Sequence, residues 1–216
     1  MSSVPKLSDS VEKGSDPIEI GVLISGRGSN LQAIIDAIAE GRLNAHIAVV
    51  ISNRADAQGL HRAQAAGIET IVMSHRDVAS REAYDEVLVR VLRDRRVRVV
   101  CLAGFMRLLG PVFCDAFPNA ILNVHPSLLP AFPGVDAQHQ AIEAGVRVSG
   151  ATVHFVTPEL DAGPVILQAA VPVVAGDDAG TLSEHILEQE HRILPVALQW
   201  VIDGRCRIDG DRVVVG

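Results

Sequence analysis

The chain has 216 residues, of which 48% are hydrophobic but only 3% aromatic, and its formal net charge is −7. A chain of this length can bury a full core, and an interior of Val, Ile, Leu and Ala favours parallel strands covered by helices over a β-sandwich. The acidic charge argues against general nucleic-acid binding, and no apolar run is long enough to span a membrane. The only lysines are Lys6 and Lys13, so any bound phosphate would be held by backbone amides, hydroxyls or arginine.

The cysteines Cys101, Cys114 and Cys206 are odd in number and follow no zinc-binding spacing. Without a secretory leader, this pattern predicts no metal and a location in the reducing cytoplasm. Cys101 lies in an apolar run and is expected in the core. Residues 1–17 are polar and lack periodicity, which predicts a flexible N-terminal tail.

From residue 18 to residue 125, strand and helix patterns alternate along the chain. We expect Ser80 to cap a helix, and Ser29 or Asn30 to cap an earlier one. The alternation predicts a doubly wound, Rossmann-like α/β sheet that is mostly parallel, with helices on both faces and ligands beyond the carboxyl ends of the strands. Strands are expected at 18–25, 45–52, 68–73, 97–102 and 121–125, and helices from about 29 and at 57–66, 81–93 and 111–116.

After residue 130 the pattern changes. Two longer runs rich in β-forming residues, 149–156 and 164–174, predict an extension of the sheet in which at least one strand is antiparallel. A helix is expected at about 136–144, a long one at 181–202, and a small edge hairpin at 205–215. We see no second domain boundary, so residues 18–216 are predicted to form a single domain.

A glycine turn, Gly26-Arg27-Gly28-Ser29-Asn30, follows the first predicted strand. Free N–H groups and the dipole at a helix start favour an anion at such a turn. The third glycine of the dinucleotide fingerprint is missing, which argues against an NAD-dependent oxidoreductase. A tight turn without a ligand is the alternative interpretation.

Asn123 and His125 end a strand that Pro126 stops, because proline has no N–H for the sheet. They lie on one face, roughly 6–7 Å apart along the backbone, and both could donate to an oxygen that develops negative charge. Asp161, in a loop bounded by Gly and Pro, could approach His125 and favour its charged form, which can then donate a proton. The alternatives are a capping Asn, a hydrogen-bonded structural His and an ordinary turn Asp.

Seven stretches resemble the phosphoribosylglycinamide formyltransferase family, over about residues 18–208. They are SGRGSNLQA at 25–33, SREAY at 80–84, LAGFMRL at 102–108, LNVHPSLLP at 122–130, VHFV at 153–156, LDAGP at 160–164, and Glu190-His191. The resemblance implies transfer of a formyl group from the co-substrate 10-formyltetrahydrofolate to the amine of N1-(5-phospho-D-ribosyl)glycinamide in purine (IMP) biosynthesis, without a metal. It also implies small-molecule substrates, no nucleic-acid or membrane partner, and a possible homodimer.

The resemblance also assigns roles to individual residues. Asn123 and protonated His125 would hold the tetrahedral oxyanion, while Asp161 keeps His125 charged. Residues 18–120 would form the phosphate-binding half of one formyltransferase domain, and residues 121–216 the catalytic and folate-binding half. The phosphoribosylglycinamide would contact Gly28, Ser29, Asn30 and Glu190. The folate would contact Arg81, Met106, Arg107, Leu108, Leu109, Asn123, Thr157 and Asp161.

The chain departs from many relatives at two positions. Gln138 stands where they carry a histidine, with His139 beside it, and Arg27 in the glycine turn is larger than the usual residue. Arg27 could contact phosphate or face solvent. His154 is interpreted as a structural histidine that faces either the core or the site, and His191 as a neighbour of Glu190 rather than a catalyst.

Other functions remain open at this point. A formyltetrahydrofolate deformylase would use the same Asn, His and Asp with water as the acceptor. A methionyl-tRNA formyltransferase would normally add a domain for tRNA. A non-catalytic nucleotide-binding α/β module would need none of the three side chains.

Overall fold

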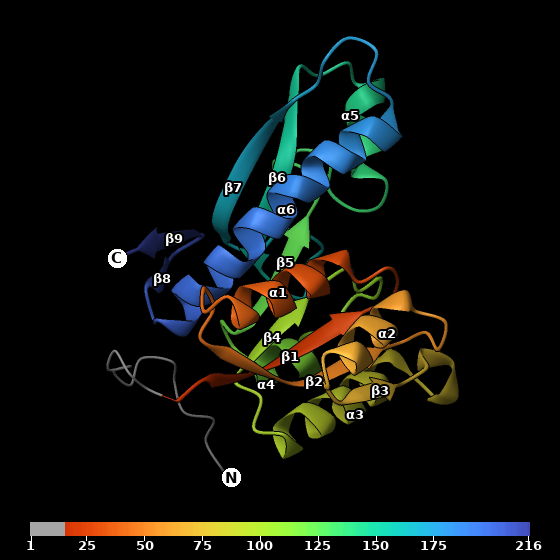
Figure 1. The fold of residues 1–216 in the computed structure, drawn as a ribbon, viewed down its shortest axis with the longest axis vertical. Helices are drawn as coiled ribbons and strands as arrows, with labels where there is room; N and C mark the ends of the chain where they lie inside the picture. The colour runs from red at the N-terminus through yellow and green to blue at the C-terminus, as the bar shows by residue number, and fades with distance from the viewer. Residues whose placement is uncertain (1–15) are drawn as a thin grey trace.

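A computed structural model describes residues 16–216, so the predicted tail of residues 1–17 lies almost wholly outside the described residues. The main sheet has seven strands in the order β3-β2-β1-β4-β5-β6-β7, and Figure 1 shows it running through the whole molecule. Five strands are parallel: β1 (Ile18–Ile24), β2 (Ala45–Ser52), β3 (Thr70–Val72), β4 (Val99–Leu102) and β5 (Ile121–His125). β6 (Val148–Phe155) and β7 (Val165–Pro172) continue the sheet antiparallel, which confirms the predicted fold class.

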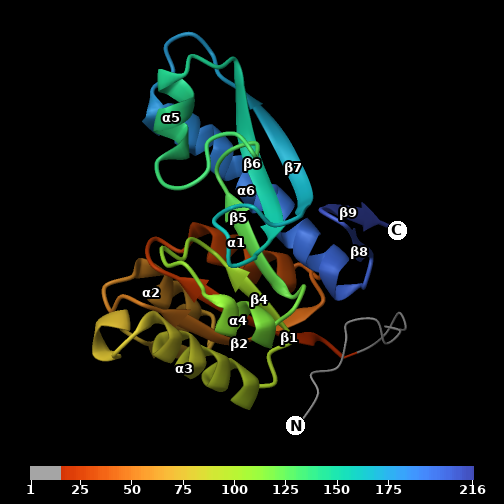
Figure 2. The same ribbon diagram turned by 180° about the vertical axis from the view of Figure 1, so that it is seen from behind.

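Helices cover both faces of this sheet. One face carries α1 (Ser29–Ala39), α2 (Gln58–Ala65) and the long α6 (Ala179–Ile202), which lie in front in Figure 1. The opposite face carries α3 (Arg81–Asp94) and α4 (Pro111–Ala116), seen from behind in Figure 2. The short α5 (Ala137–Glu143) packs against α6 beside the β6–β7 extension.

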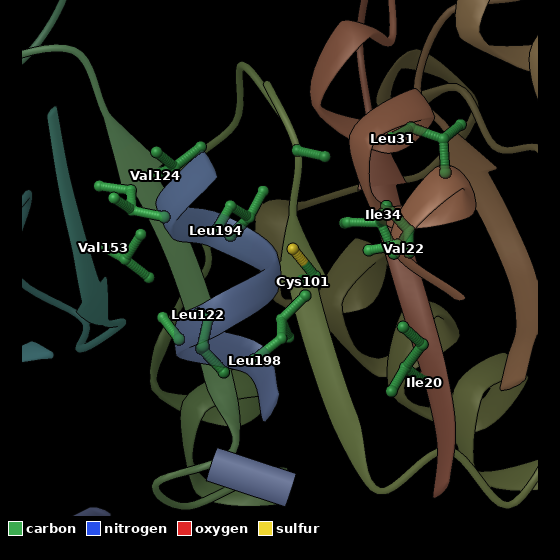
Figure 3. Packing of buried hydrophobic residues seen from close by; sticks show 14 of the residues in the cluster. Ile20, Val22, Leu31, Ile34, Cys101, Leu122, Val124, Val153, Leu194 and Leu198 are labelled. Carbon is green, nitrogen blue, oxygen red and sulfur yellow. The ribbon is translucent and has the colours of Figure 1, made fainter. Parts of the chain in front are cut away.

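The hydrophobic alternation of the strands explains this layering. On β1, Ile20 and Val22 pack toward α1 and α6, whereas Leu23 between Val22 and Ile24 packs toward α3. Figure 3 shows Leu194 and Leu198 of α6 over the strand face that also carries Cys101 and Leu122. Cys101 is fully buried, as expected, and burial raises the pKa of its thiol to about 12.

The ends of several elements differ from the sequence-based expectation. β3 is shorter than predicted, and a 3-10 helix, η1 (His75–Asp77), follows it. Ser80 caps α3 as predicted, because its hydroxyl accepts from the backbone N–H of Ala83 at 3.1 Å. The predicted hairpin forms as β8 (Cys206–Asp209) and β9 (Arg212–Val215), but in a two-stranded sheet of its own.

Within residues 16–216, no helix combines the length and apolarity that a membrane crossing requires. The same part of the chain contains no group of three or more His, Cys, Asp or Glu side chains placed to hold a metal ion.

Candidate active site

Asn123 and His125 end β5 at the carboxyl edge of the parallel strands, where an α/β sheet places its ligands. Antiparallel pairing with β6 sets Asn123 opposite His154 and His125 opposite Thr152. The side-chain nitrogen of Asn123 lies 3.2 Å from Nε2 of His154. The two strands therefore bring an amide and two imidazoles to one end of the sheet.

The hydrogen bonds of His154 define its tautomer. Its Nδ1 lies 2.8 Å from the carbonyl oxygen of Phe155, which can only accept, so Nδ1 carries the hydrogen. Nε2 therefore accepts a hydrogen bond from the amide of Asn123. Burial lowers the pKa of His154, which keeps the ring neutral. His154 is thus a buried, hydrogen-bonded histidine, as interpreted from the sequence, and it also fixes a residue of the site.

His125 is buried, with both ring nitrogens facing oxygen acceptors. Its Nε2 lies 2.8 Å from the carbonyl oxygen of Phe132, and its Nδ1 lies 3.4 Å from Oδ2 of Asp161. Since a carbonyl and a carboxylate can only accept, an imidazolium satisfies both contacts and a neutral ring satisfies one. The structure therefore brings together all three residues that the sequence assigns to catalysis.

Asp161 is held in place by backbone rather than by another side chain. It adopts φ of 50°, a left-handed conformation that is uncommon outside glycine, and its Oδ2 accepts from the N–H of Gly134 at 2.8 Å. Its Oδ1 lies 3.8 Å from Nε2 of His154. Strained backbone of this kind persists only where the surroundings fix it, and here it aims the carboxylate at His125.

The loop between β5 and α5 supplies both backbone partners of this group, the carbonyl of Phe132 and the N–H of Gly134. Thr152 anchors this loop, because its hydroxyl donates to the carbonyl of Ser127 at 2.7 Å and accepts from the N–H of Leu129 at 3.0 Å. No sequence motif could have revealed these partners, because they are backbone atoms.

The glycine turn joins β1 to α1. Gly28, not Ser29 or Asn30, is the N-cap of α1, with φ of 70° and no side-chain capping bond, so the predicted cap is wrong. Glycine takes this left-handed conformation without a steric cost, and no Ser or Asn side chain is then needed to turn the chain. The first N–H groups of α1 lack intrahelical partners, as at any helix start.

Asn30 instead donates from its side-chain nitrogen to Oε2 of Glu190 at 2.7 Å, and both side chains are buried. Burial raises the pKa of Glu190 to about 7, against the opposing effects of the Asn30 hydrogen bond and the charge of Arg27. The turn at the start of the chain thus meets a carboxyl group on α6 that is 160 residues away in the sequence.

A cavity of about 1140 Å³ extends along the carboxyl edge of the sheet. Its wall includes the turn residues Gly28, Ser29 and Asn30 together with Glu190, so the four predicted substrate-binding residues face one space. Val124 and Pro126, the chain neighbours of His125, also line it, so the group of Asn123, His125 and Asp161 lies close to this space. The turn residue Arg27 also lies in the wall.

The residues predicted to bind folate fall into two groups. Met106 and Leu108 expose 71% and 51% of their surface, whereas Leu109 is buried in the core below α3 and α4. Arg81 donates to the carbonyl of Leu109 at 3.1 Å, so it supports this segment. The N–H of Met106 donates to the Ser25 hydroxyl at 2.8 Å, which ties the segment to the end of β1.

Two further predicted residues can be placed. Thr157 begins the loop that ends at Asp161, and its hydroxyl donates to the carbonyl of Glu159 at 3.3 Å. Gln138, the departure from many relatives, lines the cavity. Its neighbour His139 is exposed and lies 3.4 Å from Glu143, one helical turn on, so it does not replace the missing histidine in the cavity.

Comparisons with known proteins agree with this geometry. Residues 18–198 match the formyl transferase family (Formyl_trans_N). Phosphoribosylglycinamide formyltransferase of Escherichia coli (strain K12) is 47% identical over 203 residues, which cover 91% of this chain and 96% of that protein. A crystal structure of glycinamide ribonucleotide transformylase 1 from Symbiobacterium toebii superposes with a TM-score of 0.93 at 52% identity, covering 96% of this chain and 99% of that one.

Longer relatives contain the same unit. The trifunctional purine biosynthetic protein adenosine-3 of Gallus gallus is 47% identical over 194 residues, which are 90% of this chain but 19% of that protein. The chain therefore spans about a fifth of the length of this relative. The resemblance inferred from the sequence motifs is confirmed, and the chain belongs to the formyl transferase family.

Proposed function

We propose that the chain transfers the formyl group of 10-formyltetrahydrofolate to the primary amine of N1-(5-phospho-D-ribosyl)glycinamide, a step of purine biosynthesis. One observation carries the proposal. Asn123, His125 and Asp161 meet close to a cavity that is lined by the glycine turn with Asn30 and Glu190 and by the chain neighbours of His125. A site of this kind can hold a phosphorylated amine at one end and activate a carbonyl at the other. The names of the bacterial relatives support the same acceptor.

In this reaction the amine nitrogen attacks the formyl carbon, and the carbonyl oxygen becomes an oxyanion. The bond between that carbon and N10 of the folate then breaks, the amine loses a proton and N10 gains one. Asp161 takes up the proton in this proposal, directly or through a water molecule. Its negative charge beside His125 also favours the imidazolium that stabilises the oxyanion.

Asn123 and His125 contribute to the oxyanion in different ways. Asn123 uses one side-chain hydrogen on His154, and its second hydrogen meets no acceptor among the described residues, so it can be donated to the oxyanion. His125 has both nitrogens engaged by Phe132 and Asp161, so it acts through its positive charge. It gives the oxyanion a hydrogen bond only when its Nε2 releases the carbonyl of Phe132.

The folate is proposed to lie against Met106, Arg107 and Leu108, beside Asn123, with the loop from Thr157 to Asp161 on the far side of the pocket. Arg81 and the buried Leu109, which are joined by a hydrogen bond, support the Met106–Leu108 segment from its buried side.

The three free cysteines fit a reducing compartment, so we propose a cytoplasmic enzyme. Sedimentation of the purified chain would test the expected homodimer.

The acceptor is tested by offering the protein 10-formyltetrahydrofolate with phosphoribosylglycinamide, with initiator methionyl-tRNA, or with water alone. The proposal expects rapid release of tetrahydrofolate only with phosphoribosylglycinamide. Release at the same rate in water alone would identify a deformylase, and formylation of the tRNA would identify the other transferase. No release in any arm would leave only the non-catalytic binding module.

A further inference from the structure

Helix α2 packs against the glycine turn and donates hydrogen bonds to two of its carbonyl groups. We propose that Gly59 and Arg62 of this helix are positioning residues that orient the turn for a phosphate group. The inference rests on the proposed function, which makes the turn the phosphate site. Neither residue lies among the cavity-lining residues, so their effect must be exerted through the turn.

Gly59 brings the backbone of α2 into direct contact with the turn. Its N–H donates to the carbonyl of Gly26 at 3.0 Å. A Cβ atom added to Gly28 would lie 2.5 Å from the Cα of Gly59. A Cβ atom added to Gly59 would lie 2.6 Å from Cδ1 of Ile24 and 3.1 Å from the Cα of Gly28. The two glycine backbones therefore pack closely against each other, and Ile24 also crowds a side chain at Gly59.

Arg62, one turn further along α2, holds the next peptide unit. Its Nε donates to the carbonyl of Arg27 at 3.0 Å, and its Nη1 donates to the side chain of Gln32 on α1 at 3.3 Å. The stem of Arg62 also lies against Gly28, 3.5 Å from the position of an added Cβ atom. One side chain thus contacts the turn and the helix that follows it.

These contacts determine where the N–H groups of the turn point. In a trans peptide unit the C=O and the N–H of the next residue point in opposite directions. Because the carbonyls of Gly26 and Arg27 point toward α2, the N–H groups of Arg27 and Gly28 point away from it. The N–H groups of Arg27 and Gly28 are thus available for a ligand, as are the unpartnered N–H groups in the first turn of α1. Several free N–H groups in one short segment favour a phosphate group.

A residue that orients only the phosphate-binding amides has a specific kinetic signature. Loosening the turn weakens interactions with the phosphate and leaves those with the formyl donor unchanged. The ratio of kcat/KM for phosphoribosylglycinamide to kcat/KM for the same acceptor without its phosphate should therefore fall. A change that merely destabilises the fold lowers the amount of active protein and leaves this ratio unchanged.

The first test replaces Arg62 with Met, which keeps much of the stem and removes the guanidinium. We expect the dissociation constant for ribose 5-phosphate, measured by calorimetry, to rise about tenfold, and the phosphate-dependent ratio to fall by a similar factor. Arg62→Lys, which can still donate one hydrogen bond to the Arg27 carbonyl, should restore part of the loss. Arg90→Met, at an exposed arginine on α3, is the matched control and should change neither quantity.

The second test compares Gly59→Ala with Gly21→Ala. An added Cβ atom at Gly21 would lie 2.5 Å from the Leu92 side chain, so this change also crowds the interior but far from the turn. Both variants should lose stability, whereas only Gly59→Ala should weaken ribose 5-phosphate binding. Equal binding by Gly59→Ala and Gly21→Ala, or wild-type affinity and ratio in Arg62→Met, would overturn the inference.

The binding arm separates this inference from the proposed reaction. Weaker ribose 5-phosphate binding in Arg62→Met, in a protein that transfers no formyl group, would support the positioning role and refute the reaction. Normal binding in an active Arg62→Met enzyme would refute the positioning role and leave the reaction intact.

Discussion

The side-chain amide of Asn123 donates to Nε2 of His154, 3.2 Å away, and this bond joins β5 to β6 at the carboxyl end of the parallel strands. The ring of His154 is itself fixed by the carbonyl of Phe155 at 2.8 Å. A neutral, buried histidine thus selects the orientation of the amide that we propose to face the formyl group. Substrate-facing groups supported in this way lose little freedom when the substrate binds.

His154→Leu removes that support without touching the proposed oxyanion. We expect kcat to fall about 10- to 100-fold because the Asn123 amide is no longer held in one orientation. KM for both substrates should change much less. Stopped-flow or steady-state kinetics would measure this split, with His139→Ala, at an exposed ring on α5, as the control. The positioning role of His154 would be contradicted if kcat fell by the same factor in His154→Leu and His139→Ala.

Asp161→Asn replaces a carboxylate by a neutral group of the same shape. Without the negative charge 3.4 Å from Nδ1, the positive form of His125 loses its ion-pair partner and the attacking amine loses its proton acceptor, so kcat should fall. Steady-state kinetics at matched concentrations of folded protein would measure the loss. Near wild-type turnover in Asp161→Asn would refute the electrostatic role.

Glu190 should make stability depend on pH. Its pKa is raised from 4.5 to about 7, so the folded state binds a proton more tightly than the unfolded state. The free energy of unfolding should therefore decrease as pH rises from 4.5 to 7, by on the order of 3 kcal/mol from this group alone. This loss of stability, which arises from ionising the buried carboxyl, is absent below pH 4.5 and complete well above pH 7.

Glu190→Gln removes the ionisable group and therefore the loss of stability at high pH. Glutamine still offers an acceptor to Asn30, and its amide can donate to Oδ1 of Asn30, which is buried without a partner among the described residues. Urea denaturation should find the variant more stable than the wild type at pH 8 and nearly equal at pH 4.5. A stability difference that is constant across this range would show that the carboxyl does not titrate as expected.

Gly163→Ala should destabilise the loop that carries Asp161. An added Cβ atom would overlap the carbonyl oxygen of Phe155, the acceptor that fixes His154. Because backbone must move to relieve the overlap, we expect a loss of about 1–3 kcal/mol in unfolding free energy, together with reduced kcat. Urea denaturation would measure the loss. Gly180→Ala, in the first turn of α6, is the control, because its added Cβ atom would lie 3.2 Å from Oδ1 of Asp178, a side chain that can shift, and not against backbone. Its loss should be much smaller, and equal stability of the two variants would contradict the prediction.

The sequence predicted most of the scaffold, because hydrophobic periodicity determines which face of each strand is buried. The residues at 121–125 suit a buried strand and Pro126 marks its end, so the sequence places Asn123 and His125 on one face of β5. β3 was predicted too long, since a three-residue edge strand leaves little periodicity. The cap of α1 was wrong because residue type cannot show that Gly28, rather than Ser29, takes the left-handed conformation.

Contacts distant in sequence could not be predicted from local patterns. The bond between Asn30 and Glu190 spans 160 residues, and its only sequence signal was a resemblance to a known family. The partners supplied by Phe132 and Gly134 are backbone atoms. Any residue could supply the carbonyl, and any residue except proline could supply the N–H. Arg62 gave no signal either, because an arginine on an amphipathic helix is usually a surface charge.

We propose that Asn123 and His125 stabilise an oxyanion during formyl transfer, and the turnover of Asn123→Ala and His125→Ala tests this role. It is measured with 10-formyltetrahydrofolate and phosphoribosylglycinamide, at matched concentrations of folded protein. We expect each variant to bind ribose 5-phosphate normally but to lose at least ~10²-fold in kcat, as for the removal of an oxyanion-stabilising group. Near wild-type turnover in either variant would contradict it.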